Sequence, residues 1–282
     1  MKKKRNIIVK ENSNIIDYLK PYGLSKNKTK TYIKLGYISI NNQVVKKLPL
    51  NLKTGDIITI DENQSEINGF KIIYEDENYL VVDKPSGLLT ISTSNINKNK
   101  ELTLYRQVRE YLNNKHEYAF IVNRIDKETS GLVIFVKNEP LKEKLQSNWN
   151  HIVKKRGYIA IVSGKITKKG RIENYLYEDK QTFSHSTKVG GKLAISNYTP
   201  IKINDKYTLL DINIETGRKN QIRVHMSEMN HPIIGDKKYK CIDNSLKRLA
   251  LHHYEISLID PITNKLLTFK SNIPHEFYNL FK

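Results

Sequence analysis

The spacing of apolar residues in the first part of the chain predicts a small unit of short elements. Apolar positions at helical spacing predict one helix from Ile15 to Leu19 and a second from Lys26 to Leu35. Ser25 is suited to cap the second helix, and Gly36 is suited to end it. Short apolar runs after turns predict three strands, at residues 37–40, 44–45 and 57–60. Together these elements make a unit of about 50 residues.

A polar segment follows this unit. The stretch from Asp61 to Gly69 has no apolar periodicity, which predicts a linker, and we place it at residues 63–69. The linker separates a first domain, residues 1–62, from a second domain, residues 70–282.

Strands outnumber helices in the second domain, and most of them follow one another directly along the chain. Apolar runs predict strands at residues 71–74, 79–83, 132–137, 156–164, 193–198, 207–214, 249–258 and 265–270. Helical spacing predicts helices at residues 102–112, 140–149 and 218–229. This order predicts an α+β domain, with a mixed but mostly antiparallel sheet flanked by helices and loops.

The chain is strongly basic along most of its length. Of its 282 residues, 48 are Lys or Arg and 29 are Asp or Glu, which gives a formal net charge of +19. This excess predicts a polyanionic partner, most simply a nucleic acid attracted by long-range steering and counterion release. A compositional bias towards Lys, Asn and Ile would instead leave solvated lysines without a specific partner. An anionic membrane surface is disfavoured because the sequence has no basic amphipathic helix or lipidation signal.

Cysteine content and the length of apolar runs exclude other classes. The single cysteine, Cys241, excludes an intramolecular disulfide framework and a cysteine-rich zinc site. His252 and His253 are adjacent in a predicted strand and point to opposite faces, so they are a poor metal pair. No apolar run reaches the roughly 18 residues of a membrane span, and the basic N-terminus precedes no signal-peptide core. We therefore expect a cytoplasmic, monomeric protein without a bound metal.

One candidate for chemistry is Asp126, which precedes the predicted strand at residues 132–137. Arg124 lies two residues before it, and the segment from Thr129 to Gly131 predicts a turn. A carboxylate on a loop that a rigid strand holds is a common position for a nucleophile or a base. An aspartate that only caps a turn has the same local pattern, and the local sequence alone favours that interpretation.

Two distant segments also place polar residues at the edge of apolar elements. Tyr158 lies in a strand that is otherwise apolar. In the last predicted helix, Ile222, Met226 and Met229 form a stripe that faces the core. Arg223 borders this stripe, where a guanidinium can be partly buried against a carboxylate. Taken singly, Tyr158 is more typical of a packed core tyrosine, and Arg223 of a surface arginine.

The first domain resembles the S-four type RNA-binding domain, which is named for a protein of the small ribosomal subunit. The matching features are Ser25-Lys26 at the start of the second helix, residues 35–41, and Gly55-Asp56 before the final strand. The family usually has Arg where Lys26 stands, and Gly where Asn42 stands. Phosphate contacts are expected from the lysines of the second helix, Lys26, Lys28, Lys30 and Lys34.

The second domain resembles the RluA-like pseudouridine synthases in four segments that stand in the family's order. Residues 123–132 resemble its His-Arg-Leu-Asp-x-x-Thr-Ser-Gly-Leu signature, with Asn123 in place of His and Ile125 in place of Leu. Residues 75–87 resemble the family's first motif, and residues 155–164 resemble its Lys-x-Tyr-x-Ala-x-Val-x-Gly strand. Residues 216–225, together with residues 231–236, resemble its third motif. In the third motif, Lys219-Asn220 replace Thr-His, and Met226 replaces Leu.

This resemblance implies that the protein isomerises uridine in RNA without a metal or an organic cofactor. The uracil is detached from its ribose, turned, and reattached through a ring carbon. Asp126 would stabilise or capture the sugar as positive charge develops on it. Arg223 would pair with Asp126 and lower the pKa of its carboxyl, and Tyr158 would stack on the base and serve in proton transfer. The residues implied in substrate binding are Arg124, Gln221, Arg218 and Met226.

The resemblance also agrees with the basic charge. A uridine inside RNA structure reaches such a pocket only when it is turned out of its stack, and phosphate contacts support that step. Large-subunit ribosomal RNA is the family's commonest substrate, and transfer RNA is the alternative. Two other classes stay open: an RNA-binding protein without activity, and a carboxylate-dependent glycosidase. The glycosidase is disfavoured because the motifs hold no second carboxylate as an obvious partner.

Overall fold

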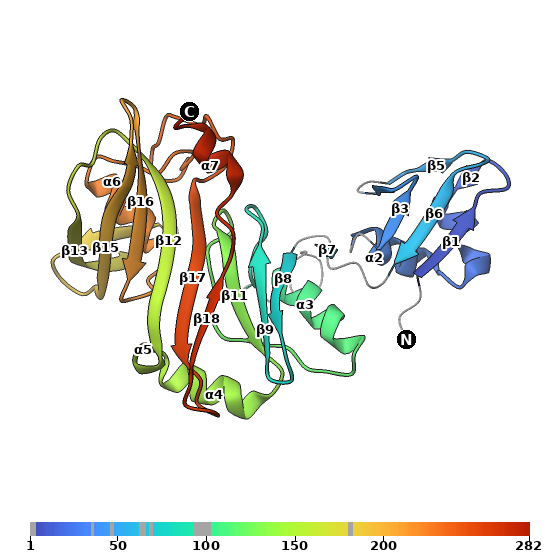
Figure 1. Cartoon of the computed structure of the whole chain (residues 1–282), viewed down its shortest axis with the longest axis horizontal. Helices are drawn as coiled ribbons and strands as arrows, with labels where there is room; N and C mark the ends of the chain where they lie inside the picture. The colour runs from blue at the N-terminus through green and yellow to red at the C-terminus, as the bar shows by residue number, and fades with distance from the viewer. Residues whose placement is uncertain are drawn as a thin grey trace. The chain divides into compact units, whose positions relative to one another are not determined.

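The fold divides between a short N-terminal unit and a longer C-terminal unit. The computed structural model describes residues 4–34, 37–45, 48–61, 66–67, 70–92, 103–179 and 183–282. By their contacts, the two units are Met1–Ile72 and Ile73–Lys282 (Figure 1). Most of the predicted linker at residues 63–69 lies outside the described residues. Within it, β7 (Glu66–Ile67) pairs with β8 (Phe70–Glu75) in an antiparallel manner.

The first unit is built on a four-stranded antiparallel sheet in the order β1-β6-β3-β4. Its helices begin as predicted: the Ser25 hydroxyl accepts a hydrogen bond from Lys28 N at 3.3 Å and caps α2. The predicted helix end, Leu35-Gly36, lies outside the described residues. The elements are β1 (Lys4–Ile8), β2 (Ser13–Asn14), α1 (Ile15–Tyr18), the 3-10 helix η1 (Lys20–Tyr22), α2 (Lys26–Lys34), β3 (Ile38–Ile40), β4 (Gln43–Val44), β5 (Asn51–Leu52) and β6 (Ile57–Asp61).

Strand β1 was missing from the sequence prediction. It is an edge strand whose Ile7 is buried in the core of the unit, whereas the neighbouring Ile8 is 64 % exposed. With charged residues before this pair, the chain shows too little alternation to predict a strand. Pairing with β6 therefore decides the structure of this segment, with Ile7 opposite Ile58.

The second unit is built on one large sheet with helices packed on it, and the last strands of that sheet, β8 and β7, begin before the division at Ile72. In the sheet, β10 and β18 pair with β11 and β17, and the other strands run in the order β14-β13-β15-β16-β12-β17-β11-β9-β8-β7. Among the strand pairs whose registers are described, only β11 with β17 is parallel. The prediction of an α+β fold around a mostly antiparallel sheet is confirmed. The remaining strands are β9 (Tyr79–Lys84), β10 (Phe120–Ile121), β11 (Ser130–Val136), β12 (Val153–Ser163), β13 (Gly170–Glu178), β14 (Ser184–Thr187), β15 (Lys192–Ile203), β16 (Tyr207–Ile214), β17 (Leu251–Ile259) and β18 (Leu266–Lys270), and the helices are α3 (Leu104–Asn113), α4 (Glu139–Ser147), α5 (Trp149–Ile152), α6 (Gln221–Glu228) and α7 (His275–Asn279).

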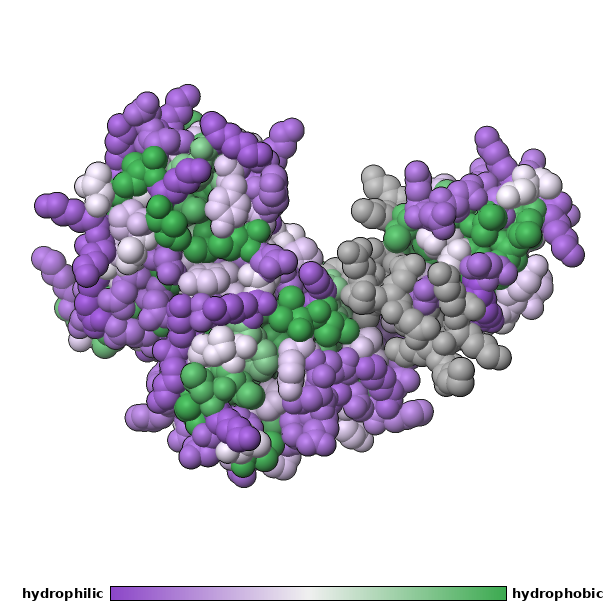
Figure 2. Space-filling model, in the orientation of Figure 1, coloured by the Kyte–Doolittle hydropathy of each residue, from purple (hydrophilic) through white to green (hydrophobic). Residues whose placement is uncertain are grey.

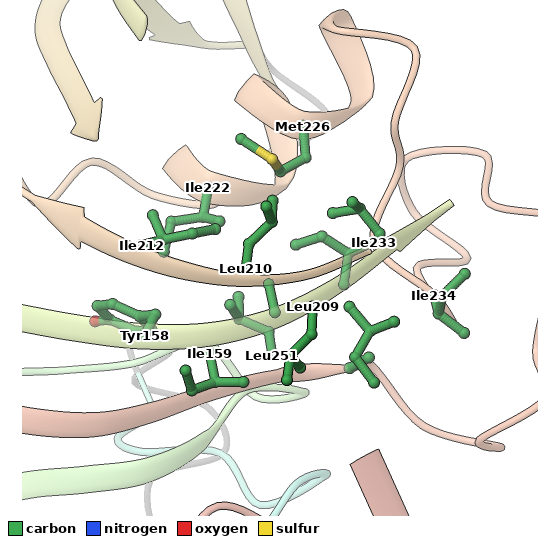
Figure 3. Packing of buried hydrophobic residues seen from close by; sticks show 14 of the residues in the cluster. Tyr158, Ile159, Leu209, Leu210, Ile212, Ile222, Met226, Ile233, Ile234 and Leu251 are labelled. Carbon is green, nitrogen blue, oxygen red and sulfur yellow. The ribbon is translucent and has the colours of Figure 1, made fainter. Parts of the chain in front are cut away.

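Helix α6 and strands β12 and β16 enclose the main core of the second unit. Ile222 and Met226 of α6 point onto Leu210 and Ile212 of β16 (Figure 3). Each such buried aliphatic side chain stabilises the fold by about 1.5–3 kcal/mol. The predicted core-facing stripe of α6 is confirmed, because Ile222 and Met226 are buried and Met229 packs against the same cluster. This packing fixes α6, and with it Arg223, against the sheet.

Strands β13 and β14 were also missed, and the reason is their exposure. The sequence predicted no strand between residues 164 and 193. Leu176 of β13 is buried, whereas Tyr175 and Tyr177 on either side of it are 50 % and 44 % exposed. Strand β14 lies at the edge of the sheet and β13 lies next to it. Strands that bury few side chains lack the apolar run from which a strand is predicted.

Gly131 holds β11 against β17. We predicted a turn from Thr129 to Gly131, but Ser130 and Gly131 already belong to β11. The φ of Gly131 is +116°, and a Cβ there would lie 2.2 Å from the carbonyl oxygen of His253. Glycine is therefore required by the close approach of β17 and by the backbone conformation, and not by a turn.

Hydrophilic side chains cover most of the face shown in Figure 2, in keeping with the charge of +19. Among the described residues, no helix is long and apolar enough to cross a membrane. The part of the chain that the structure describes holds no cluster of three or more His, Cys, Asp or Glu side chains suited to a metal ion.

Candidate active site

Asp126 lies on the loop between β10 and β11, and hydroxyl groups of the segment after β9 hold that loop. Thr90 Oγ1 donates to the carbonyl oxygen of Ile125 at 2.6 Å, and Ser86 Oγ donates to that of Glu128 at 2.6 Å. The backbone on both sides of Asp126 is thereby tied to a second segment. Residues 75–87, which the sequence related to the family's first motif, thus help to position the carboxylate.

The buried Lys84 makes the same connection with its ammonium group. Its Nζ donates to the carbonyl oxygens of Pro85, Leu88 and Lys127, at 2.9, 2.7 and 3.0 Å. Burial lowers the pKa of Lys84 to about 7. The negative charges of Glu128 and Asp126 raise this pKa and offset part of the effect of burial. Three carbonyl acceptors match the three N–H donors of the charged form. Lys84 therefore positions the loop of Asp126, a role that its place in a motif did not reveal.

Replacing Lys84 by Met is expected to lower the free energy of unfolding by about 1–3 kcal/mol, because three buried carbonyl groups lose their donor. Catalysis is expected to slow by about 10- to 100-fold, since the loop of Asp126 loosens. Urea unfolding and initial rates of pseudouridine formation measure the two effects. Lys137→Met is the control: Lys137 is also largely buried, but it binds Glu75 and Glu117. Equal activity of folded Lys84→Met and wild type would contradict the positioning role.

Arg223 lies between two carboxylates. Its Nε and Nη2 donate to Asp236 at 2.7 Å each, and its Nη1 donates to Asn220 Oδ1 at 3.1 Å. The Nη1 atom also lies 3.7 Å from Asp126 Oδ2. Arg223 is therefore held in a fixed direction by a bidentate pair with Asp236 and approaches Asp126 with its remaining edge. The sequence predicted that the Arg223 guanidinium is partly buried against a carboxylate, and that carboxylate is chiefly Asp236.

The pKa of the Asp126 carboxyl is raised although Arg223 lies beside it. Burial raises this pKa above its usual value, and the charges of Arg223 and Lys238 offset only part of that rise. Arg223 therefore acts in the predicted direction, but desolvation outweighs it, and the charge of Asp236 adds to the rise. The ionised carboxylate is consequently less stable here than in water.

Tyr158 lies on β12 opposite His253 of β17, and the two rings stack. Their centroids are 4.4 Å apart with an interplanar angle of 14°. His253 Nδ1 lies 2.8 Å from the carbonyl oxygen of Leu132 in β11, which fixes the imidazole. Burial raises the pKa of Tyr158, with the charge of Asp126 acting in the same direction. The phenol therefore keeps its proton, and one face of its ring is covered by His253.

The role of His253 was not found from the sequence. We treated His252 and His253 only as a poor metal pair, and both are buried in the sheet. Burial lowers the pKa of His253 to about 4 and that of His252 to about 3, so both rings are neutral at neutral pH. Only the register of β12 against β17 brings His253 to Tyr158, and one sequence does not give that register.

Gln221 has its side chain inside the protein. Its Oε1 accepts from Thr216 Oγ1 at 2.8 Å and from Arg218 N at 3.0 Å. Its Nε2 donates to the carbonyl oxygen of Ile195 at 2.9 Å and lies 3.0 Å from Ser196 Oγ. The predicted substrate contact of Gln221 is thus replaced by a structural one, because its amide ties the loop before α6 to β15.

The other residues predicted to bind substrate differ in their exposure. Arg124 and Arg218 are exposed, and Arg218 Nε donates to the carbonyl oxygen of Leu193 at 2.8 Å. Met226 has no exposed surface and belongs to the core (Figure 3), so its predicted contact with substrate is wrong for this structure. Asn123, where the resemblance differs, accepts a hydrogen bond from Ile134 N at 2.7 Å and thereby closes the loop onto β11.

The predicted RNA-binding lysines lie on α2 of the first unit. Lys26, Lys28 and Lys30 are exposed, and Lys28 Nζ lies 5.4 Å from the centre of the Tyr32 ring. The side chain of Lys34 lies outside the described residues. Within the first unit these cations are free to meet solvent or a bound polyanion.

The second unit therefore combines a carboxylate on a braced loop, a bidentate arginine beside it and a buried stacked tyrosine on one antiparallel sheet. Solved structures described as human RNA pseudouridylate synthase domain containing 4 and 1 have this fold. The first has a TM-score of 0.59, 21% identity, and coverage of 73% of this chain and 89% of its own. The second has a TM-score of 0.59, 19% identity, and coverage of 72% and 83%. At such identities, the likeness shows the fold.

Sequence similarity gives the family. Residues 78–228 match the family model described as RNA pseudouridylate synthase. The chain is 31% identical over 265 residues to the Bacillus subtilis protein named uncharacterized RNA pseudouridine synthase YhcT, covering 88% of this chain and 83% of that protein. It is 30% identical to ribosomal large subunit pseudouridine synthase D of Zymomonas mobilis, covering 92% and 89%. The chain belongs to the RNA pseudouridine synthase family and is an isomerase that modifies RNA.

Proposed function

We propose that this enzyme isomerises specific uridines of large-subunit ribosomal RNA, with Asp126 as the catalytic carboxylate. The relatives named ribosomal large subunit pseudouridine synthase D support this substrate, among them one from Borreliella burgdorferi at 35% identity over 238 residues. The observation that carries the chemistry is the position of Asp126, whose Oδ2 lies 3.7 Å from Arg223 Nη1 on a loop braced from both sides.

In the proposed reaction, the target uridine is turned out of its stack and enters the site beside Tyr158. The bond between the ribose and the ring nitrogen breaks, and the ionised Asp126 stabilises or captures the sugar centre. The freed uracil turns and bonds to the sugar through a ring carbon, and any bond between the sugar and Asp126 breaks. The ring carbon then loses its proton, and the ring nitrogen that left the sugar takes one up, so the product is an isomer of uridine. Tyr158 stacks on the base with the face opposite His253, and Arg124 helps to hold the turned-out nucleotide or fill the space that it leaves. No metal or organic cofactor takes part in these steps.

The charge around Asp126 suits this role. Burial raises the pKa of its carboxyl, so a desolvated carboxylate is more reactive towards a cationic sugar than a hydrated one. Arg223, Lys238 and Lys84 are the cations that lower this pKa and so favour the ionised carboxylate. Protonation of Asp126 removes the charge that the reaction needs, so activity is expected to fall as the pH is lowered. Because the pKa of Asp126 is raised above the usual 3.8, this fall is expected at a higher pH than for an exposed aspartate.

Unmodified transcripts test the substrate. Large-subunit ribosomal RNA and a pool of transfer RNAs, both made without modification, are incubated with the purified enzyme, and pseudouridines are mapped chemically. We expect conversion at one or a few positions of the ribosomal RNA. Conversion of transfer RNA alone would overturn the ribosomal substrate and leave the isomerase activity intact.

We further propose that the first unit is an S-four type domain that binds RNA phosphates through the lysines of α2. Replacing Lys26, Lys28 and Lys30 together by Gln is expected to weaken RNA binding by about tenfold at moderate salt. The slope of the logarithm of the binding constant against the logarithm of the salt concentration is expected to become less steep by about three, one for each lost phosphate contact. Titrations at several salt concentrations measure both. The matched control replaces three exposed lysines of the other unit, Lys144, Lys154 and Lys265. The same loss in both variants would show that α2 has no special role.

A further inference from the structure

A line of aromatic rings leads from Arg223 to the outer edge of the sheet. The Arg223 guanidinium lies 5.3 Å from the centre of the Tyr239 ring. Tyr239 meets Phe183 edge to face at 6.1 Å, and Phe183 is nearly parallel to His185 at 6.2 Å and 18°. His185 lies 5.7 Å from Tyr177. We call Tyr239, Phe183, His185 and Tyr177 the aromatic row.

The aromatic row is buried at one end and open at the other. Tyr239 is 8 % exposed, whereas the side chain of His185 is 46 % exposed and Tyr177 is 44 % exposed. Tyr177 and His185 lie opposite each other in the register of β13 against β14, so they share a face of the sheet. The core explains Tyr239, which packs with Leu176. Neither of the two outer rings belongs to that cluster, although removing them from water would be favourable.

The inner end of the row is fixed and stands beside the catalytic site. Tyr239 Oη accepts from Ser184 N at 3.1 Å and donates to the carbonyl oxygen of Ser184 at 3.3 Å, which ties the ring to β14. Tyr239 follows Asp236 by three residues and donates its backbone N–H to that carboxylate at 3.1 Å. Since Asp236 also binds Arg223, the row and Asp126 share one rigid anchor.

A cation accompanies the row. Lys238 Nζ lies 4.5 Å from the centre of the Phe183 ring and 5.9 Å from that of Tyr239. Its charge also lowers the pKa of the Asp126 carboxyl, which shows that it is close to the site. A positive charge among partly exposed rings is the combination with which proteins bind unpaired nucleotides, since bases stack on the rings and phosphates meet the cation.

We propose that the aromatic row binds unpaired nucleotides that flank the target uridine, with bases stacked on Tyr177 and His185 and a phosphate at Lys238. This inference rests on the proposed chemistry at Asp126, because it takes the row to begin where the target base enters. Stacking tolerates any base, so the row would hold the strand in place while selection of the position lies elsewhere. The RNA binds to the outer rings only where it is single-stranded, because the faces of paired bases are covered by their neighbours in the helix.

Binding of a labelled RNA tests the inference. The probe is a single-stranded RNA of about 12 nucleotides that carries 2-aminopurine, whose fluorescence is quenched by stacking on aromatic rings. The variant is Tyr177→Ala with His185→Ala in the full chain. Its matched control is Tyr118→Ala, an exposed tyrosine (72 %) just before β10, which pairs with the end of β11 far from Asp126.

We expect the double variant to bind the single strand about tenfold more weakly and to lose most of the quenching, whereas Tyr118→Ala behaves as wild type. Lys238→Gln is expected to make the slope of log binding constant against log salt concentration less steep by about one, which corresponds to one lost phosphate contact. Phe183→Leu removes one ring of the row but keeps an apolar side chain against the cluster of Tyr239. Weaker RNA binding by this variant therefore reports the loss of a ring and not a loss of folding. Wild-type affinity and quenching in the double variant would overturn the inference, as would an equal loss of affinity for duplex RNA. Failure of the proposed chemistry is seen separately, as an absence of conversion by the wild type.

Discussion

Replacing Asp126 by Asn is expected to lower the rate of pseudouridine formation by about 10⁴-fold or more, the scale seen when a catalytic nucleophile is removed. The amide keeps the size of the side chain but carries no negative charge for the sugar centre. Single-turnover rates with excess enzyme measure the chemical step directly. The control is Asp205→Asn, because Asp205 is a 96 % exposed carboxylate paired with Lys165.

RNA affinity separates this loss from a loss of binding. We expect Asp126→Asn to bind its RNA within about twofold of wild type, because the loop remains braced by Thr90 and Ser86. A variant that retained more than a tenth of the wild-type rate would show that another group carries the reaction.

Replacing Arg223 by Met is expected to lower the free energy of unfolding by about 3–5 kcal/mol, since it leaves the buried Asp236 carboxylate unpaired. The side chain of Asp236 has no exposed surface, and both its oxygens bind Arg223. Chemical denaturation measures the loss. Catalysis is expected to fall as well, because the cation that lies 3.7 Å from Asp126 is removed.

A second substitution distinguishes the two roles of Arg223. Asp236→Leu added to Arg223→Met replaces the buried ion pair by apolar groups of similar volume, and such exchanges often restore stability. We expect the double variant to regain most of the unfolding free energy without regaining activity. Recovery of both would show that Arg223 acts only through the fold, and that its edge towards Asp126 has no catalytic use.

The sequence predicted the sheet and singled out candidate residues for the site, but it did not predict the contacts of those residues. Asp126, Tyr158 and Arg223 were chosen from three separated segments, and the structure brings Arg223 within 3.7 Å of Asp126. Long apolar runs such as β11 and β16 were found because their strands bury most of their residues. The edge strands β1 and β14, and β13 beside β14, were missed because they bury few of their side chains.

What the sequence did not give depends on groups that meet only in the folded chain. Asp236 stands in a recognised motif, but its bidentate grip on Arg223 follows from the loop after α6. The direction of the pKa shift of Asp126 follows from desolvation, and a sequence does not show how much water a loop excludes. The stack of His253 on Tyr158 depends on strand register across nearly 100 residues of chain.

The most direct measurement of the central claim is a map of pseudouridines in the RNA of cells that lack this gene. Such cells are complemented either with the wild-type chain or with Asp126→Asn. We predict that specific pseudouridines of large-subunit ribosomal RNA disappear with the gene, return with the wild type and stay absent with Asp126→Asn. A map that does not change when the gene is lost, or one that Asp126→Asn restores, would contradict the claim that this enzyme isomerises uridine through Asp126.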